Sequence, residues 1–486
     1  MLSNTKLLIP FLIFMLLYQF SCKTIKTDSL TKKYAPASLK NDVSVLEKVS
    51  ACMHPVYGIY HSRHFYDSLF RSFSGSLTDS LTEKQFRIKL KLVAGNLRCG
   101  HTEIIASKKT IKHLRKKKFN FSPYLFMPVG DTLYMAAALN KKDSLIKKGA
   151  RITKINGIPA DSIIRYSRRF ISTDGFNKTM PEYYIQWNFN PFYLSLFGRP
   201  DTFNVEYSSG NKIQKIHYPA IRLKQLPVVI KNPISDSSYI KLKRAKCFYN
   251  SVGANKKAFV IRVKAFSFVG YKRAYRKMFR KANAVKPDAL VLDLRGNGGG
   301  SLANSYKLLS YLLDSTYTQT LKTGIRNYPY RKYTRGNFSF RFTKFALRML
   351  GSYKHRNDTA CFTMRIKPNR RHHYSGKLYV LINGASFSAS GLVSAYLKKR
   401  PNTVIVGEET GGAMEGCNAG ITPYYTLPNT GIRVRMPAFR VVHDVSPEPT
   451  GHGVIPDIKI KYAIQDIFAR RDLEMQKILE LINSAQ

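Results

Sequence analysis

Apolar and polar positions follow three different patterns along the chain. From Val43 to about Leu97 the apolar residues recur at helical spacing, and Thr82 ahead of Glu83 is a helix start signal. Residues 115–220 instead contain short β-rich runs, such as "TLYMAAAL" and "FNVEY", separated by turn clusters. From Phe259 onward, apolar strands alternate with amphipathic helices, which is typical of a mainly parallel sheet covered by helices. These patterns predict an N-terminal helical region, a β-rich module and an α/β core.

The N-terminus predicts export. The apolar run "LLIPFLIFMLLYQF" follows Lys6 and is long enough for the core of a signal peptide, but short for a membrane span. Cys22 closes it, so residues 1–22 resemble a bacterial lipoprotein signal with Cys22 as the lipidated residue. An ordinary signal peptide with an incidental cysteine is the alternative. Residues 23–42 are polar without periodicity and are predicted to be a tether. We therefore expect a lipid-anchored protein of the cell envelope.

The charge balance is strongly basic. Lys and Arg number 80 against 29 Asp and Glu, a formal net charge of +51. These residues are spread along the chain as singles and doublets, without an arm, a zinc finger or another nucleic-acid module, so nucleic acid is not the favoured partner. An anionic envelope polymer is a better candidate, because such a charge attracts polyanions. The cysteines after Cys22 have no CxxC spacing, so neither a zinc site nor a full disulfide framework is indicated.

A glycine cluster follows one of the predicted buried strands, in "ALVLDLRGNGGGS". Clustered glycines let the backbone approach a ligand and turn N–H groups outward. Ser301 stands where a dinucleotide fingerprint needs glycine, and no Gly-Lys-Ser/Thr follows, which disfavours a phosphate loop. A plain tight turn remains an alternative. The favoured interpretation is an anion hole for a developing oxyanion.

A second strand end carries three serines, in "LYVLINGASFSASGLVSAYLKK". Ser386, Ser388 and Ser390 occupy alternate positions where a predicted strand passes into a predicted helix. A hydroxyl there lies near free N–H groups and the positive end of a helix, which favours developing negative charge. Serines at such a place also commonly cap the helix, so this motif alone does not identify a nucleophile.

Together these segments carry a family resemblance. "DLRGNGGGS", "LINGASFSASGLVSAYL", "TVIVGEETGGA" and "GHGVIPDI", in this order, resemble the S41 family of serine peptidases, the C-terminal processing and tricorn-core-like proteases. The resemblance implies an α/β fold: a crotonase/ClpP-like core with a PDZ-like β-rich module and an N-terminal helical region. The expected boundaries are a signal peptide at 1–22, a tether at 23–42, helices at 43–114, the PDZ-like module at 115–220 and the peptidase core at 221–486.

The resemblance also implies site residues. The family has a glutamate three residues after its nucleophile, a position that Gly391 occupies here, so the nucleophile maps to Ser388. The implied oxyanion donors are the N–H groups of Ala389 and of a glycine in the turn, Gly299 first and Gly298 next.

The implied base comes from the tricorn-like branch. The processing-protease branch uses a lysine where "GEETGGA" has Ala413, so that mechanism is not available. The tricorn-like branch uses an upstream histidine, which maps to His101 in "LRCGHTEI". Gly100 replaces the serine that usually precedes this histidine. The glutamate that the tricorn type has just before "GVIPD" aligns with Thr450 here, and of the nearby Glu448 and His452, Glu448 is the candidate partner that orients His101.

The sequence therefore predicts an exported serine endopeptidase that cleaves polypeptides without a metal or organic cofactor. A retired S41-like protein, which binds peptide or anionic polymer without cleavage, is the main alternative, because Gly391 and Ala413 depart from the family pattern. A basic adhesin for an anionic polymer is a third interpretation.

Overall fold

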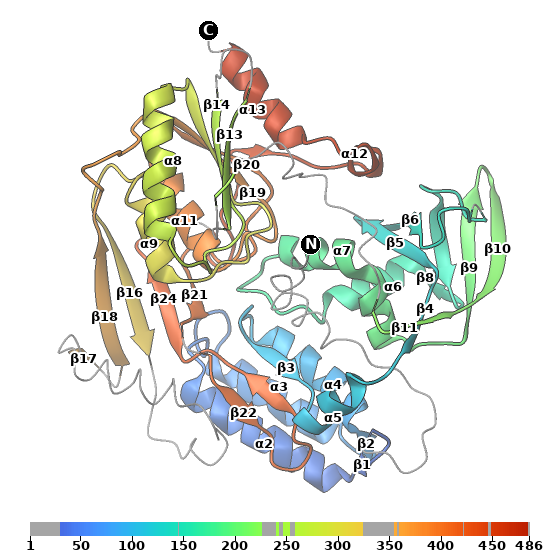
Figure 1. Ribbon diagram of the computed structural model, residues 1–486. Helices are drawn as coiled ribbons and strands as arrows, with labels where there is room; N and C mark the ends of the chain where they lie inside the picture. The colour runs from blue at the N-terminus through green and yellow to red at the C-terminus, as the bar shows by residue number, and fades with distance from the viewer. Residues whose placement is uncertain are drawn as a thin grey trace.

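The structure, a computed structural model, arranges the chain in three parts (Figure 1). It describes residues 30–143, 145–225, 240–242, 246–252, 258–323, 354–356, 359–420, 422–445 and 449–484. Cys22, the predicted signal peptide and the start of the predicted tether lie outside these residues. Among the described helices, none combines the length and the hydrophobicity that a membrane span needs.

The N-terminal part consists of α-helices packed on one another. They are α2 (Pro36–Met53), α3 (Arg63–Gly75), α4 (Glu83–Asn96) and α5 (Lys108–Leu114), with a short strand pair, β1 (Lys33–Tyr34) and β2 (Leu81–Thr82). Helix α2 begins inside the segment predicted to be a tether, with proline at a first-turn position that tolerates it. At the start of α4, the Thr82 hydroxyl accepts from the Gln85 N–H and the Gln85 side chain accepts from the Thr82 N–H. Leu46, Phe70 and Phe86 belong to the shared core.

A small sheet ties this part to the C-terminal half of the chain. Strand β3 (Glu103–Ile105) pairs with β23 (Arg433–Arg435), which pairs with β22 (Tyr424–Thr426). The Asp42 carboxylate of α2 accepts the N–H groups of Asn429 and Thr430 in the turn between β22 and β23. Because β3 begins two residues after His101, this pairing fixes the position of His101 relative to the core.

The β-rich module is a twisted antiparallel sheet with two helices against it. Its strands are β5 (Tyr124–Val129), β6 (Thr132–Ala138), β7 (Arg151–Ile155), β8 (Ile158–Pro159), β9 (Thr202–Ser209) and β10 (Lys212–Pro219), with β4 (Phe119–Phe121) paired to β11 (Ile221–Leu223). Asn156 and Gly157 join β7 to β8 with φ angles of 49° and 79°, the left-handed conformation that a tight hairpin needs.

The helices of the module are α6 (Ala160–Arg168) and α7 (Thr179–Leu196). The β-rich prediction for residues 115–220 did not include the 18 residues of α7. Their aromatic residues and internal proline obscure the helical period, and the helix is kinked at Asn188, where φ is −138°. The start of α7 is bound to the core, since the Asn177 amide donates to the Thr410 carbonyl and the Thr179 hydroxyl donates to the Glu409 carbonyl.

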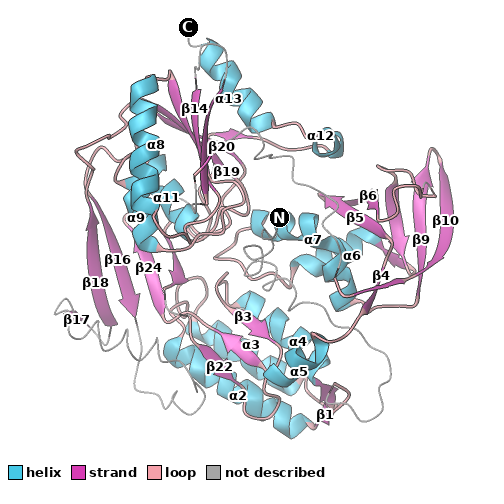
Figure 2. Cartoon of the chain, in the orientation of Figure 1, coloured by secondary structure: helices cyan, strands magenta, loops and turns pink. Residues whose placement is uncertain are grey.

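The core is a seven-stranded sheet covered by helices on both faces (Figure 2). Its order is β12 (Ile240–Lys241), β13 (Cys247–Val252), β14 (Ala258–Val263), β15 (Ala289–Asp293), β19 (Lys377–Ile382), β20 (Thr403–Gly407) and β25 (Ile458–Lys459). The strands from β14 to β25 are parallel. Every residue of β14 and β15 is buried, as expected for parallel strands covered on both faces.

Helices α8 (Tyr271–Val285), α9 (Leu302–Leu309) and α11 (Ala389–Lys398) pack on one face of this sheet. Helix α13 (Leu473–Ser484) packs on the other face, after the short α12 (Ile464–Ala469). A second, antiparallel sheet flanks the core and contains β16 (Tyr317–Thr323), β17 (Lys354–Arg356), β18 (Thr359–Ile366), β21 (Gly416–Ala419) and β24 (Phe439–His443).

A buried ionic cluster fixes the start of the glycine-rich turn after β15. The Arg295 guanidinium lies 2.9 Å from the Asp293 carboxylate, 2.6 Å from that of Asp472 and 3.0 Å from that of Glu474. Asp472 and Glu474 lie at the start of α13, so the cluster connects the turn to that helix. Removing one partner from such a buried pair typically costs about 3–5 kcal/mol, because a buried charge is left uncompensated.

Candidate active site

Ser388 lies at a sharp turn between β19 and α11. Its backbone angles, φ 56° and ψ −116°, are sparsely populated for a residue with a side chain. The side chain makes no capping hydrogen bond to α11, although the residue stands at the N-cap position. Strain at a strand-to-helix turn without a capping role is the conformation that exposes a nucleophilic hydroxyl.

The neighbouring serines have structural surroundings. The Ser386 hydroxyl accepts from the Asn383 N–H at 3.1 Å and donates to the Leu294 carbonyl at 2.9 Å, which ties this turn to the end of β15. Ser390 is fully buried in α11. Ser388 is half-buried and lines a cleft, so it alone of the three faces the solvent.

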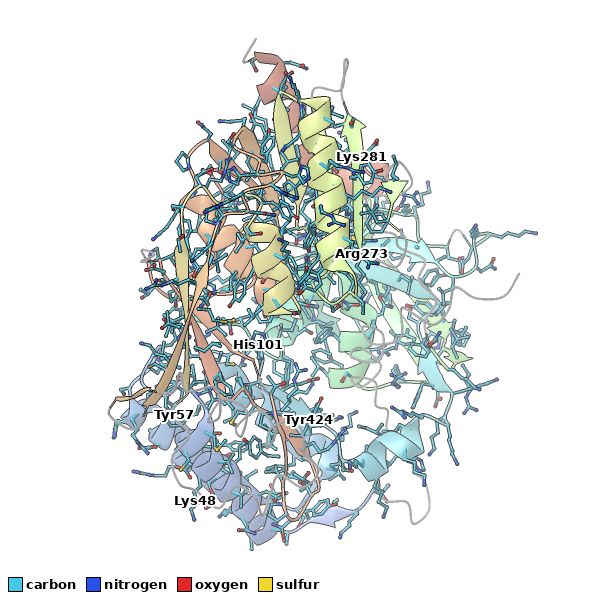
Figure 3. All side chains as sticks on the ribbon, turned by 60° about the vertical axis from the view of Figure 1, so that its left-hand side comes forward. Lys48, Tyr57, His101, Arg273, Lys281 and Tyr424 are labelled. Atoms are coloured by element: carbon cyan, nitrogen blue, oxygen red, sulfur yellow. The ribbon has the colours of Figure 1, made fainter. Side chains whose placement is uncertain are left out.

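His101 approaches Ser388 from the N-terminal part. Its Nε2 lies 3.1 Å from the Ser388 Oγ, and its ring packs on Phe387 with the centroids 4.6 Å apart. Figure 3 shows His101 where the N-terminal helices meet the core. His101 and Ser388 are 287 residues apart in sequence, and the pairing of β3 with β23 holds the histidine close to the serine. Burial lowers the pKa of His101 to about 3, and the nearby Arg435 guanidinium lowers it too, so the imidazole is neutral at neutral pH.

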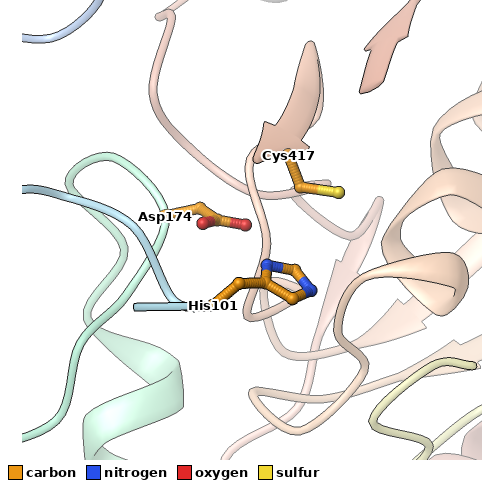
Figure 4. A group of neighbouring side chains, drawn as sticks. All are labelled: His101, Asp174 and Cys417. Atoms are coloured by element: carbon orange, nitrogen blue, oxygen red, sulfur yellow. The ribbon is translucent and has the colours of Figure 1, made fainter. Parts of the chain in front are cut away.

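Two side chains that the sequence did not single out lie beside the His101 ring. Nδ1 faces the Asp174 carboxylate, and the Cys417 sulfur lies near the ring (Figure 4). One nitrogen of His101, one carboxylate oxygen of Asp174 and the Cys417 Sγ all lie within 4.8 Å of one another. Within the described part of the chain, neither the buried Nδ1 nor the buried Oδ2 of Asp174 has a hydrogen-bond partner.

Asp174 is held in place by the residue before the histidine. The Gly100 N–H donates to its Oδ1 at 2.8 Å, and a Cβ at Gly100 would lie 2.7 Å from the Phe387 ring. A side chain here, such as the serine of the tricorn-like pattern, would therefore displace Phe387. Burial raises the pKa of Asp174 to about 7, with a further contribution from the Glu415 carboxylate, while the Gly100 hydrogen bond and Arg440 oppose the increase.

The glycine-rich turn lies directly against Ser388. Gly299 has φ 98°, and a Cβ there would lie 2.8 Å from the Ser388 Cβ and 2.9 Å from the Ala389 nitrogen. The Gly299 N–H, which the sequence predicted as an oxyanion donor, donates to Oδ1 of Asn297 at 2.9 Å. Among the described residues, the N–H groups of Gly298 and Ala389 have no acceptor. The free donors beside Ser388 are thus Gly298 and Ala389.

The lysines closest to Ser388 in sequence are bound elsewhere. Lys398 pairs with Asp457, and the Lys399 ammonium donates to the Asp444 carbonyl at 2.9 Å, both at the far end of α11. Ala413 is buried. Glu448, the partner that the sequence predicted for His101, lies outside the described residues.

A cleft of about 1000 Å³ leads to Ser388 and His101 and is lined by all three parts of the molecule. Met180, Tyr184 and Phe192 contribute apolar side chains from α7. Lys246 and Lys264 contribute positive charge from the core. A cleft lined by apolar side chains beside a nucleophile can hold an extended chain of residues.

Sequence reasoning missed Asp174 and Cys417. Asp174 stands in the turn "STDGFN" of the β-rich module, where an Asp-Gly pair signals only a turn. Cys417 is an unpaired thiol without a motif. Nothing along the chain connects these positions to His101, because their proximity depends on the packing of three separate parts.

Residues 257–460 match the sequence model of peptidase family S41. Among solved structures, mature CPAF complexed with lactacystin has a TM-score of 0.66 at 16% identity, over 92% of this chain and 99% of that chain. Mature CPAF by itself has a TM-score of 0.63 at 15% identity, over 92% of this chain and 98% of that chain. The photosystem II D1 C-terminal processing protease has a TM-score of 0.42 at 13% identity, over 87% of this chain and 93% of that chain. No curated protein sequence matches this one. The likeness to CPAF confirms the predicted fold class.

Proposed function

We propose that this chain is a serine-type peptidase of family S41, an exported endopeptidase that works through an acyl-enzyme on Ser388. One observation carries the proposal: the His101 Nε2 lies 3.1 Å from the Ser388 Oγ. That distance is within the hydrogen-bonding range that a general base needs. His101 is neutral at neutral pH and so has a lone pair to accept the serine proton.

The reaction follows from this pair. The Ser388 Oγ attacks the carbonyl carbon of a peptide bond while its proton passes to the His101 Nε2. The tetrahedral intermediate collapses when the Nε2–H gives that proton to the departing amine nitrogen, and the C–N bond breaks. Water then enters, His101 takes one of its protons, and the hydroxide adds to the ester carbonyl. The proton returns to the Ser388 Oγ as the new carboxylic acid leaves.

The developing oxyanion needs donors that are not already used. We assign this role to the N–H groups of Ala389 and Gly298, because the Gly299 N–H is bound to Asn297. Ala389 is the first residue of α11, where the helix dipole adds favourable charge. Gly299 serves as a spacer, since only a residue without Cβ fits against Ser388. Loss of one oxyanion donor typically lowers kcat about 10²–10³-fold.

Asp174 is our candidate for the group that orients His101. When Nε2 accepts the serine proton, Nδ1 must carry the other ring hydrogen, and an acceptor facing it fixes that tautomer. The free Oδ2 of Asp174 is a suitable acceptor, and a carboxylate oxygen of Asp174 lies within 4.8 Å of a ring nitrogen of His101. Catalytic hydrogen bonds often form fully only when substrate binds, and an N–H···O bond is then about 2.9 Å between the nitrogen and the oxygen. Glu448, implied by the family resemblance, is the alternative partner.

Export and anchoring remain proposals from the N-terminal sequence. Residues 1–22 have the organisation of a lipoprotein signal, and Cys22 is the residue we expect to be acylated. The mature chain would then lie at the cell envelope, where its formal charge of +51 favours contact with anionic polymer.

The test uses a fluorophosphonate probe, which labels only an activated serine. The parent chain should be labelled at Ser388 and should cleave an unfolded polypeptide between internal residues. Ser388→Ala and His101→Ala should lower both rates by about 10³-fold or more while the far-UV circular dichroism is unchanged. Lys398→Ala is the matched control, because this lysine lies at the far end of α11, and it should be labelled like the parent.

Two results would overturn the proposal. A folded parent chain that is neither labelled nor active on unfolded polypeptide would support the retired protein that binds without cleavage. A His101→Ala variant that is labelled as fast as the parent would show that another group activates Ser388.

A further inference from the structure

We infer that His101, Asp174 and Cys417 form an inhibitory binding site for a zinc-like divalent transition-metal ion. The inhibitory effect rests on the proposed role of His101, whereas binding of the ion does not. Three donor atoms converge from three parts of the molecule: His101 from the segment before β3, Asp174 from the module and Cys417 from β21 (Figure 4). The types of donor atom in the cluster decide which ions suit it.

The geometry is close to that of a metal site. The three donor atoms lie within 4.8 Å of one another. In a tetrahedral zinc site with bonds of about 2.0–2.3 Å, neighbouring ligand atoms are roughly 3.3–3.7 Å apart. A contraction of about 1 Å, within reach of small side-chain rotations, would close the site around an ion, and water would complete the coordination.

The bonding state of these atoms also points to a ligand. Nδ1 of His101 and Oδ2 of Asp174 are buried and have no hydrogen-bond partner among the described residues. Asp174 is 1% exposed and Cys417 is 5% exposed, so these two donor groups are buried. Buried polar atoms without partners are uncommon, and an ion bound between them would satisfy both.

Charge and ligand type select the class of ion. A thiolate and a carboxylate would balance two positive charges, which makes a divalent complex neutral in a buried place. Sulfur and imidazole ligands favour zinc and similar transition metals over magnesium and calcium, which prefer oxygen. Arg435 and Arg440 lie close enough to oppose a cation, so we expect moderate affinity.

Binding of the ion would remove the base. When the ion takes the Nδ1 lone pair, the ring hydrogen must move to Nε2 for the imidazole to stay neutral. Nε2 then presents N–H to the Ser388 Oγ, 3.1 Å away, and cannot accept the serine proton. The proton balance is complete: the imidazole keeps one hydrogen, the Cys417 thiol releases one, and Asp174 releases one if it is protonated.

The first experiment measures binding without activity. Full-length mature Ser388→Ala protein is titrated with Zn²⁺ in competition with a chromophoric chelator, and separately with Co²⁺, whose thiolate complexes show a ligand-to-metal charge-transfer band. Zn²⁺ should bind at one site and Mg²⁺ should not compete. Adding Cys417→Ala or Asp174→Asn should weaken Zn²⁺ binding by about 10-fold or more, and Cys417→Ala should abolish the Co²⁺ band. Cys52→Ala, in α2, is the matched control and should retain both.

The second experiment measures the effect on the serine. In protein with Ser388 intact, Zn²⁺ should slow fluorophosphonate labelling and a chelator should restore it. Each variant is normalised to its own rate without metal, and Cys417→Ala should lose most of its sensitivity to Zn²⁺. The inference is overturned if Cys417→Ala and Asp174→Asn bind Zn²⁺ like the parent, or if bound Zn²⁺ leaves labelling unchanged. Absent labelling without metal would count against the proposed function alone, since binding is measured with Ser388→Ala.

Discussion

His54, a buried histidine close to the active site, makes the stability of the protein depend on pH. It lies at the end of α2 with 4% of its surface exposed. The Val56 N–H donates to its Nδ1 at 3.1 Å, so Nε2 carries the ring hydrogen and faces the Thr102 hydroxyl at 2.7 Å. Thr102 is the residue after His101. Protonation of Nδ1 would break the bond from Val56 and charge a buried ring, so we expect acid to destabilise this region.

The size of the effect follows from proton linkage. Burial lowers the pKa of His54 to about 3, against about 6.5 in the unfolded chain. Because the folded state favours the neutral ring, the contribution to stability is complete above pH ~6.5 and is lost as the pH falls toward 3. Each pH unit below the unfolded-state pKa of about 6.5 costs roughly 1.4 kcal/mol. At pH 5, about 1.5 units lower, the loss of stability is therefore about 2 kcal/mol. A typical domain has only about 5–15 kcal/mol in total.

The assay is chemical unfolding of the parent and His54→Gln at pH 7.5 and pH 5, followed by circular dichroism. Glutamine cannot titrate, so the variant should not lose the stability that the parent loses in acid. The unfolding free energy of the variant minus that of the parent should therefore be about 2 kcal/mol higher at pH 5 than at pH 7.5. His101 and His443, whose pKa values burial also lowers, are present in both proteins and cancel. His64→Gln, on the exposed surface of α3, controls for histidine content. Parallel pH dependences for the parent and His54→Gln would refute the reasoning.

Three further predictions concern the turn, a helix cap and the anchor. Gly299→Ala should reduce kcat by about 10²-fold or more with little change in peptide binding, because the added Cβ would displace Ser388 and Ala389. Full activity in a folded variant would show that this turn has no part in the mechanism. Thr82→Ala should lower the unfolding free energy by about 1 kcal/mol in denaturant melts through loss of the α4 cap, and an unchanged midpoint would contradict this. Cys22→Ala should move the protein from the membrane fraction to the soluble fraction in a detergent partition assay; unchanged partition would reject lipidation.

Local features of the fold were predictable because each depends on a few adjacent residues. The cap at Thr82 and the strand-to-helix turn at Ser388 are both found where the sequence predicts them. Helix α7 was missed because an aromatic-rich run with an internal proline has no clear helical period. The glycine turn was identified, but the sequence gives no sign that Asn297 binds the Gly299 N–H.

The sequence by itself determined the chemical groups of this protein: a serine at a strand-to-helix turn, a histidine, a glycine-rich loop and a family resemblance that connects them. Only the tertiary structure decided which groups meet. Asp174 and Cys417 reach His101 because three parts of the molecule pack together, and no local pattern records contacts across such sequence separations. Burial in that junction also sets the pKa values of His101 and Asp174, since desolvation depends on the surrounding atoms and not on neighbours along the chain.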